Sequence, residues 1–170
     1  MPATTDLGFI EMRIAKVVGF GPPLAESIFQ CVVLDGVSGT RQVVFEIGEA
    51  EAFWLAASLQ DLEFARPMTY HFAAALLGSL GGRVREVRLD RVIEGAYAAT
   101  VDVEGALGVQ PVDARASDAL NLAAITGAPV FVSSQVADDS DRRRDGDSAE
   151  ARLLRLAPTV PSTRITREKP

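Results

Sequence analysis

The sequence predicts an α+β fold, in which a mixed, largely antiparallel sheet packs with about three helices. Short runs rich in Val and Ile recur along the chain with turn residues between them, a pattern typical of strands joined by hairpins. Apolar segments rich in Ala and Leu follow two of these groups of strands. With 170 residues, 48% of them hydrophobic, the chain can bury the core of one domain.

The first half of the chain is expected to form three strands and two helices. We predict strands at 8–20, 28–35 and 40–47, and a helix at 49–60 that starts after Gly48. Thr69 is the predicted N-cap of a second helix, which ends at Gly81-Gly82. Its predicted apolar face consists of Phe72, Ala73, Leu76, Leu77 and Leu80.

The second half is expected to continue the same alternation and then to lose its order. We predict a hairpin of strands 83–93 and 95–103, a strand at 107–113, a helix at about 117–126 and a short strand at 129–132. Ser117 is the predicted N-cap of that helix and Gly127 its end. Residues 138–170 are rich in mixed charges and lack an apolar period, so we expect domain 1–137 to be followed by a disordered tail.

Two strand-to-helix junctions resemble each other at an offset of 67 residues. FEIGEAEAFWLAA from Phe45 aligns with VDARASDALNLAA from Val112, so that Glu46 meets Asp113 and Glu51 meets Asp118. A predicted hairpin precedes each junction. The match suggests a duplicated β-β-α unit, although Ala-rich helices also align without duplication.

The charge distribution disfavours a protein that grips nucleic acid through a broad basic surface. The net charge is −6, and residues 1–137 carry 16 acidic and 9 basic side chains. The single cysteine, Cys31, lies in an apolar strand and is expected to be a buried hydrophobe. We find neither a signal-peptide pattern nor an apolar run long enough to span a bilayer, and therefore expect a cytoplasmic location.

Four segments, in order, carry a resemblance to a known family. IGEAEA, RPMT, DARASDALNLA and APVFV follow one another at a spacing that resembles the bifunctional nuclease domain, also called domain of unknown function 151, over about residues 10–136. The positions that match the family's segments are Gly48, Glu51, Arg66, Pro67, Thr69, Asp113, Arg115, Ser117 and Asp118. Where the family has His-Asp after the threonine this chain has Tyr70-His71, and Ala116 replaces the usual proline.

The resemblance implies a nuclease that hydrolyses phosphodiester bonds of DNA or RNA. Hydrolysis requires an activated water, a stabilised phosphate and a protonated or metal-bound leaving oxygen. The candidate catalytic residues are Asp113, Asp118 and His71, and the candidate substrate-binding residues are Arg66, Arg115, Ser117 and Thr69. Asp113, Asp118 and Glu51 are candidate ligands of Mg²⁺ or Mn²⁺, and no organic cofactor is expected.

A second function remains open, that of a non-catalytic binding or assembly module forming a homo-oligomer. In that case the acids at the two helix starts only stabilise their helices, and Arg115 pairs with one of them. The arginines of strand 83–93 either contact nucleic acid or protect an edge strand from aggregation. Convergence of Asp113, Asp118, Arg66 and His71 in one cleft would favour the nuclease.

Overall fold

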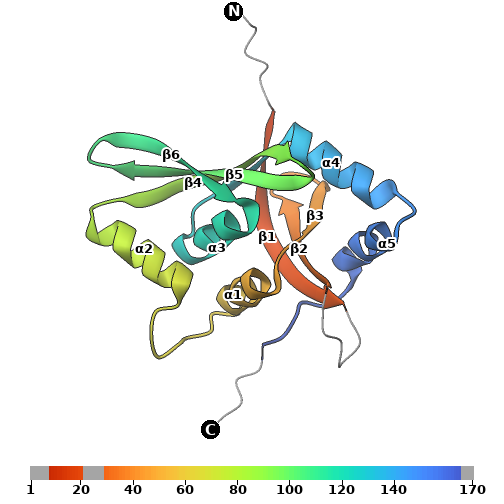
Figure 1. Cartoon of the computed structure of the whole chain (residues 1–170), viewed down its shortest axis with the longest axis horizontal. Coiled ribbons are helices and arrows are strands. Elements are labelled where there is room, and N and C mark those ends of the chain that lie inside the picture. Colours follow the sequence, from red (N-terminus) through yellow and green to blue (C-terminus); the bar gives the residue numbers. More distant parts are fainter. Residues whose placement is uncertain (1–7, 21–28, 166–170) are drawn as a thin grey trace, which may run out of the picture.

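The computed structural model describes residues 8–20 and 29–165, and these form a mixed sheet with helices on both faces (Figure 1). The described part contains seven strands, five α-helices and a short 3₁₀ helix. The strands are β1 (Phe9–Phe20), β2 (Phe29–Gly36), β3 (Gln42–Glu46), β4 (Arg83–Ile93), β5 (Ala96–Gly105), β6 (Gly108–Arg115) and β7 (Val130–Ser133). The helices are α1 (Glu49–Leu59), α2 (Thr69–Ser79), α3 (Ala116–Thr126), α4 (Ser134–Asp145) and α5 (Ala149–Leu156), followed by the 3₁₀ helix Ala157–Thr159. The α+β prediction is confirmed, with more helices than expected.

The sheet consists of two antiparallel three-stranded units joined through β7. Its strand order is β3-β2-β1-β7-β4-β5-β6, and only the β4–β7 pair is parallel among the described strands. Three strands followed by a helix therefore occur twice, as β1-β2-β3-α1 and as β4-β5-β6-α3. Phe45 pairs with Val32 in the first unit, and Val112 pairs with Val101 in the second. The repeated unit is thus β-β-β-α, one strand longer than the sequence match suggested.

Alternation along the strands directs apolar side chains into two cores. Val32, Leu34 and Phe45 belong to the larger core, to which α1 and α3 contribute. Cys31 and Val33, with the opposite parity, pack with Leu154 of α5. Burial, together with the charges of Glu46 and Glu150, raises the pKa of the Cys31 thiol to about 12, so this side chain stays protonated and acts as the buried hydrophobe that we expected.

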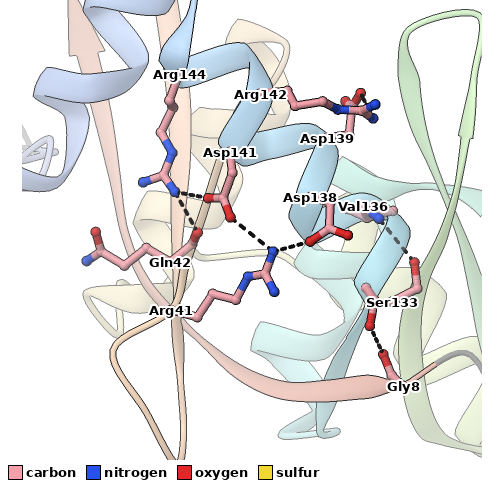
Figure 2. Close-up of polar contacts among 11 residues, drawn as sticks. Gly8, Arg41, Gln42, Ser133, Val136, Asp138, Asp139, Asp141, Arg142 and Arg144 are labelled. Atoms are coloured by element: carbon pink, nitrogen blue, oxygen red, sulfur yellow. Dashed lines mark hydrogen bonds and ion pairs between the residues drawn. The ribbon is translucent and has the colours of Figure 1, made fainter.

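The expected disordered tail was wrong for residues 138–159, which form most of α4, all of α5 and the 3₁₀ helix. Figure 2 shows how α4 is held: Arg41, from the turn before β3, forms ion pairs with Asp138 and Asp141 of the helix. Ser133 caps the helix by accepting a hydrogen bond from the Val136 N–H. The helix was not recognised in this charged sequence, because α4 is stabilised by residues that lie far away in the chain.

Helix α2 departs from the prediction in a different way. Met68 is its N-cap, and Thr69 is its first residue rather than the cap. Leu77 packs against the larger core, whereas Phe72, Leu76 and Leu80 of the predicted apolar face are 60%, 50% and 78% exposed. In the described residues, no helix is both long enough and apolar enough to cross a membrane.

Candidate functional site

The first turns of α1 and α3, the equivalent helices of the two repeated units, lie beside each other. Their N-caps are Gly48 and Arg115, and within the described structure neither helix start is capped by a side-chain hydrogen bond. Ser117, the predicted N-cap of α3, is instead its second residue, because the N-cap lies two residues earlier, at Arg115. Asn121 is fully buried and donates hydrogen bonds to the carbonyls of Glu51 and Ser117, which ties the two first turns together.

Arg115 joins the third residues of both helices. Its Nη2 lies 2.9 Å from Glu51 Oε1, and its Nε lies 2.7 Å from Asp118 Oδ2. The Tyr70 hydroxyl of α2 donates a hydrogen bond of 2.6 Å to Asp118 Oδ1. We call these four residues, Glu51, Tyr70, Arg115 and Asp118, the Arg115 cluster. The Arg115 side chain is 68% exposed, so its guanidinium is both oriented and accessible.

The cluster fixes the protonation of its members. Partial burial acts to raise the pKa of Asp118, but hydrogen bonds from Arg115 and Tyr70 outweigh it and leave the pKa below its usual value. Burial, with the hydrogen bond to Asp118, raises the pKa of Tyr70. At neutral pH, Asp118 is therefore a carboxylate and Tyr70 a protonated donor, which excludes Tyr70 as a general base.

A cavity of about 360 Å³, here called the helix-mouth cavity, opens at the starts of both helices. Gly48 of α1 and Arg115, Ala116 and Ser117 at the start of α3 contribute to its wall. The remaining walls come from β3, the β4–β5 turn, β5, α4 and α5, through residues that include Glu46, Tyr97, Arg143 and Glu150. The C-terminal helices therefore complete this cavity.

Two more charged groups in the cavity wall have defined surroundings. Arg143 donates to Asp139 at 2.7 Å and to the Gly95 carbonyl, and its guanidinium lies 5.1 Å from the centre of the Tyr97 ring. Burial, followed by the charge of Glu150, raises the pKa of Glu46 above its usual value. The cavity thus combines an oriented cation with a carboxyl group whose affinity for protons is increased.

Comparison with protein families decides the relationship of the chain. The model of the bifunctional nuclease domain matches residues 32–144, about two thirds of the sequence. The chain belongs to this family. The matched region extends from β2 to nearly the end of α4, and so contains both repeated helix starts and Arg143.

Two curated relatives match the chain, both uncharacterized proteins of Mycobacterium tuberculosis, from the strains CDC 1551 / Oshkosh and ATCC 25618 / H37Rv. Each is 30% identical over 105 residues, which cover 62% of this chain and 62% of the relative. The chain therefore aligns with about three fifths of the length of each.

The residues predicted from the bifunctional nuclease domain lie in three places. Glu51, Arg115 and Asp118 meet in the Arg115 cluster, and Ser117 lines the adjoining cavity. Arg66 and His71 line a separate hollow beside the start of α2, and Thr69 is exposed at that start. Asp113 pairs with Arg91 at 2.8 Å and is 80% exposed. The pairings and cavities therefore do not support the expected convergence on one cleft.

Asp113 and Asp118 differ because the chain changes from strand to helix between them. Asp113 pairs with Thr100 across β6 and β5, on the sheet face where Thr100 contacts Asp90 of β4. Asp118 is the third residue of α3 and faces Arg115. A strand and a helix direct their side chains with different periods. Asp113 and Asp118 therefore do not share a site, although only five positions separate them in the sequence.

The three predicted metal ligands do not form a ready donor set. Among the described residues, no group of three His, Cys, Asp or Glu side chains is arranged to hold a metal ion. Arg115 contacts the carboxylates of both Glu51 and Asp118, and Arg91 contacts that of Asp113. These carboxylates already have positive partners, so Glu51, Asp113 and Asp118 do not fit Mg²⁺ or Mn²⁺ in this arrangement.

The arginine-rich strand β4 pairs with acids on its neighbours. Arg83 contacts Glu104 at 2.6 Å, and Arg88 contacts Asp102 at 2.7 Å. Together with the Arg91–Asp113 pair, these contacts neutralise three of the four arginines considered as a nucleic-acid stripe. Cross-strand pairing explains their presence without a ligand.

Sequence reasoning missed Arg143 and Glu150 because both fall in the expected tail. One local signal was available: Ser133 and Ser148 each precede a helix and accept a hydrogen bond from the N–H three residues later. Serine in this place is a helix N-cap. In α4, Val136, Ala137 and Ser140 are the buried residues, at helical spacing between the charged ones.

Proposed function

We propose that this protein binds a phosphodiester of DNA or RNA in the helix-mouth cavity and hydrolyses it. The observation that carries the proposal is that two helix N-termini without side-chain caps, in the described structure, open on the same cavity as Arg115 and Arg143. Family membership supports a function related to nucleic acid. Two helix N-termini and two arginines at one cavity favour an anionic ligand, and a phosphodiester is such a ligand.

The helix N-termini and the two arginines would both attract a phosphate electrostatically. Free N–H groups at a helix start carry partial positive charge and bind phosphate oxygens. Arginine adds a planar fork of donors that fits two oxygens of one phosphate. Glu51 and Asp118 hold the Arg115 guanidinium in place, and Asp139 does the same for Arg143, so little side-chain entropy is lost when a phosphate binds.

Proton transfer from the attacking water is assigned to Glu46, which lies in the cavity wall and whose raised pKa makes it a stronger base than an ordinary glutamate. The water oxygen forms the new bond to phosphorus as the bond to the leaving oxygen breaks, and the leaving oxygen takes a proton from solvent water in the open cavity. Arg115 and Arg143 then offset the charge that builds up on the phosphate. The hydroxyl of Ser117 lies in the same wall and is assigned to substrate binding.

The test is cleavage of labelled single- and double-stranded DNA and RNA by the full chain, with Mg²⁺, with Mn²⁺ and with EDTA. Arg143→Met should lower the cleavage rate about 100-fold, the usual effect of losing one donor to a charged transition state. Arg142→Met is the matched control, because Arg142 also pairs with Asp139 but does not line the cavity. Absence of cleavage under every condition, or equal loss in both variants, would refute the proposal.

The alternative, a non-catalytic assembly module, is favoured by one observation on α2. Its sequence TYHFAAALLGS contains no charged residue, and Phe72, Leu76 and Leu80 form an exposed ridge at a spacing of four. Two copies of a chain with net charge −6 can approach at this helix without bringing like charges together. The proposed occupant of the ridge is therefore α2 of a second copy.

Light scattering after size-exclusion chromatography tests this alternative. Wild type should be a dimer, and Leu76→Glu should convert it to a monomer by placing like charges in the contact. Val37→Glu changes an equally exposed residue in the turn between β2 and β3 and should leave the dimer intact. A monomeric wild type excludes the oligomer.

A further inference from the structure

We propose that a second hollow, beside the start of α2, receives one unstacked nucleobase and makes single-stranded nucleic acid the preferred ligand. This inference rests on the proposed function, because it gives a binding place to the base next to a phosphate that is bound at Arg115. The hollow has a volume of about 400 Å³, within the range of small-molecule sites. Its wall includes Leu62, Phe64, Arg66, Pro67, His71 and Ala75.

The hollow offers a base an aromatic surface that is held in position. Phe64 lies in its wall, and the ring of Trp54 contacts Phe64 edge to face with centres 5.5 Å apart. The ring of Phe53 in turn contacts Trp54, with ring centres 4.7 Å apart. Stacking on aromatic rings tolerates any base and is the usual mode of binding single strands.

The polar groups of the hollow complement a nucleotide. Arg66 and His71 place a guanidinium and an imidazole in the wall of the hollow, together with the carboxylate of Glu63 and several apolar side chains. Both groups can donate hydrogen bonds to base edges, and arginine also stacks on bases. A nucleobase carries hydrogen-bond acceptors on its edges and so complements both groups.

Helix α2 connects the hollow with the Arg115 cluster. Tyr70 bonds to Asp118 in the cluster, and the next residue, His71, lines the hollow. One turn of helix rises only about 5.4 Å, so the two sites flank the same turn. In this proposal, a strand whose phosphate contacts Arg115 places an adjacent base against Phe64. In a duplex that base is stacked and paired, and entering the hollow would require flipping it out.

The experiment measures binding of fluorescent oligonucleotides to the full chain by anisotropy. The probes are an oligodeoxythymidylate, a duplex of the same length and a single strand of abasic sites, which keeps the phosphates but lacks bases. We expect the oligodeoxythymidylate to bind at least about tenfold more tightly than either of the other probes, in line with the contribution of a stacked base.

Two substitutions locate the effect. Phe64→Leu keeps an apolar side chain and removes the aromatic ring, and should weaken binding of the oligodeoxythymidylate about tenfold while leaving the abasic strand unchanged. Phe53→Leu is the matched control, since Phe53 belongs to the same aromatic series but does not line the hollow. His71→Gln should also weaken binding of the oligodeoxythymidylate, because it removes the imidazole from the hollow and leaves the Phe64 ring in place.

The outcomes separate this inference from the proposed function. If the abasic strand binds as tightly as the oligodeoxythymidylate and Arg143→Met weakens both, the base hollow is wrong and the phosphodiester site stands. Equal effects of Phe64→Leu and Phe53→Leu also overturn the hollow. If no probe binds, both proposals fail.

Discussion

Ser140 provides a sharp test of whether α4 is an integral part of this fold. Its side chain is fully buried, and its hydroxyl contacts the edge of strand β3 that pairs with no other strand in the described sheet. The Val44 N–H donates to Ser140 Oγ at 2.9 Å, and the same hydroxyl donates to the Val44 carbonyl at 3.1 Å. One side chain therefore satisfies both backbone groups that β3 leaves unpaired at this residue.

The cost of Ser140→Ala follows from these two bonds. The substitution leaves a buried N–H and a buried carbonyl without a partner, at about 1–3 kcal/mol each. Alanine recovers about 0.5 kcal/mol through its higher helix propensity. We expect a net loss of about 1.5–5.5 kcal/mol in the free energy of unfolding. For a chain of this size that corresponds to a fall of about 3–22 °C in Tm.

Urea unfolding followed by circular dichroism, together with a thermal scan, measures the change. The control is Ser79→Ala on α2, where the hydroxyl bonds a carbonyl of its own helix at an exposed position, and the expected change is below about 0.5 kcal/mol. A loss below about 1 kcal/mol for Ser140→Ala would mean that α4 does not dock on β3 as described. The reasoning about the protected edge would then be refuted.

Three further outcomes can be measured on the same protein. The folded state lowers the pKa of Asp118, so its contribution is present above about pH 4 and is lost as the pH falls through the folded pKa; the Tm difference between wild type and Asp118→Asn should shrink between pH 6 and pH 3, and a constant difference would contradict this. Lys16 donates to the carbonyls of Pro158 at 2.6 Å and Val160 at 2.8 Å, so Lys16→Met should make residues 157–165 exchange amide hydrogens faster, with other regions unchanged; uniform exchange would contradict a local clamp. Gly127 ends α3 with φ of 71°, so Gly127→Ala should cost about 1 kcal/mol in urea unfolding, and a neutral result would show that the chain relaxes there.

The strands were predictable because their signals are local. The Val- and Ile-rich runs alternate with a period of two, and glycine-containing turns separate them, as at Glu94-Gly95 between β4 and β5. These patterns gave the edges of most strands within about two residues. The N-cap of α3 was placed two residues late because serine is a good capping type, whereas the backbone uses Arg115 instead of Ser117 as N-cap.

Helix α4 was not predictable from a local pattern, for a reason that lies in its energetics. Its sequence SQVADDSDRRRD buries only Val136, Ala137 and Ser140. Its charged side chains form ion pairs, of which Arg41 supplies two from about 100 residues earlier in the chain, and hydrogen bonds to distant backbone carbonyls. A periodicity search detects buried apolar faces and does not detect pairing over such a separation. Because α4 was not predicted, Arg143 was not recognised as a residue of the cavity.

The candidate site was predictable in its chemistry and only partly in its geometry. Pairing of Arg115 with an acid at the helix start was one of the two alternatives, and the structure shows two such pairs. The separation of Asp113 and His71 from Asp118 could not be inferred, because it depends on the direction in which each element projects its side chains. His71 stands one position later than the usual family histidine and lines the hollow, while Tyr70 contacts Asp118.

The duplication explains why a single arginine serves two helices. At the offset of 67 residues, Asp118 corresponds to Glu51, and both are the third residue of their helix. The N-cap positions also correspond, but one holds Arg115 and the other Gly48. A side chain at Gly48 would collide with the carboxylate of Glu51, which folds over it. Arginines at both N-caps would add a second positive charge beside the first and displace Glu51 from its bond, whereas glycines at both would leave two carboxylates facing each other without a cation. The asymmetry at these two positions is therefore what turns a repeated helix start into a site with one accessible guanidinium.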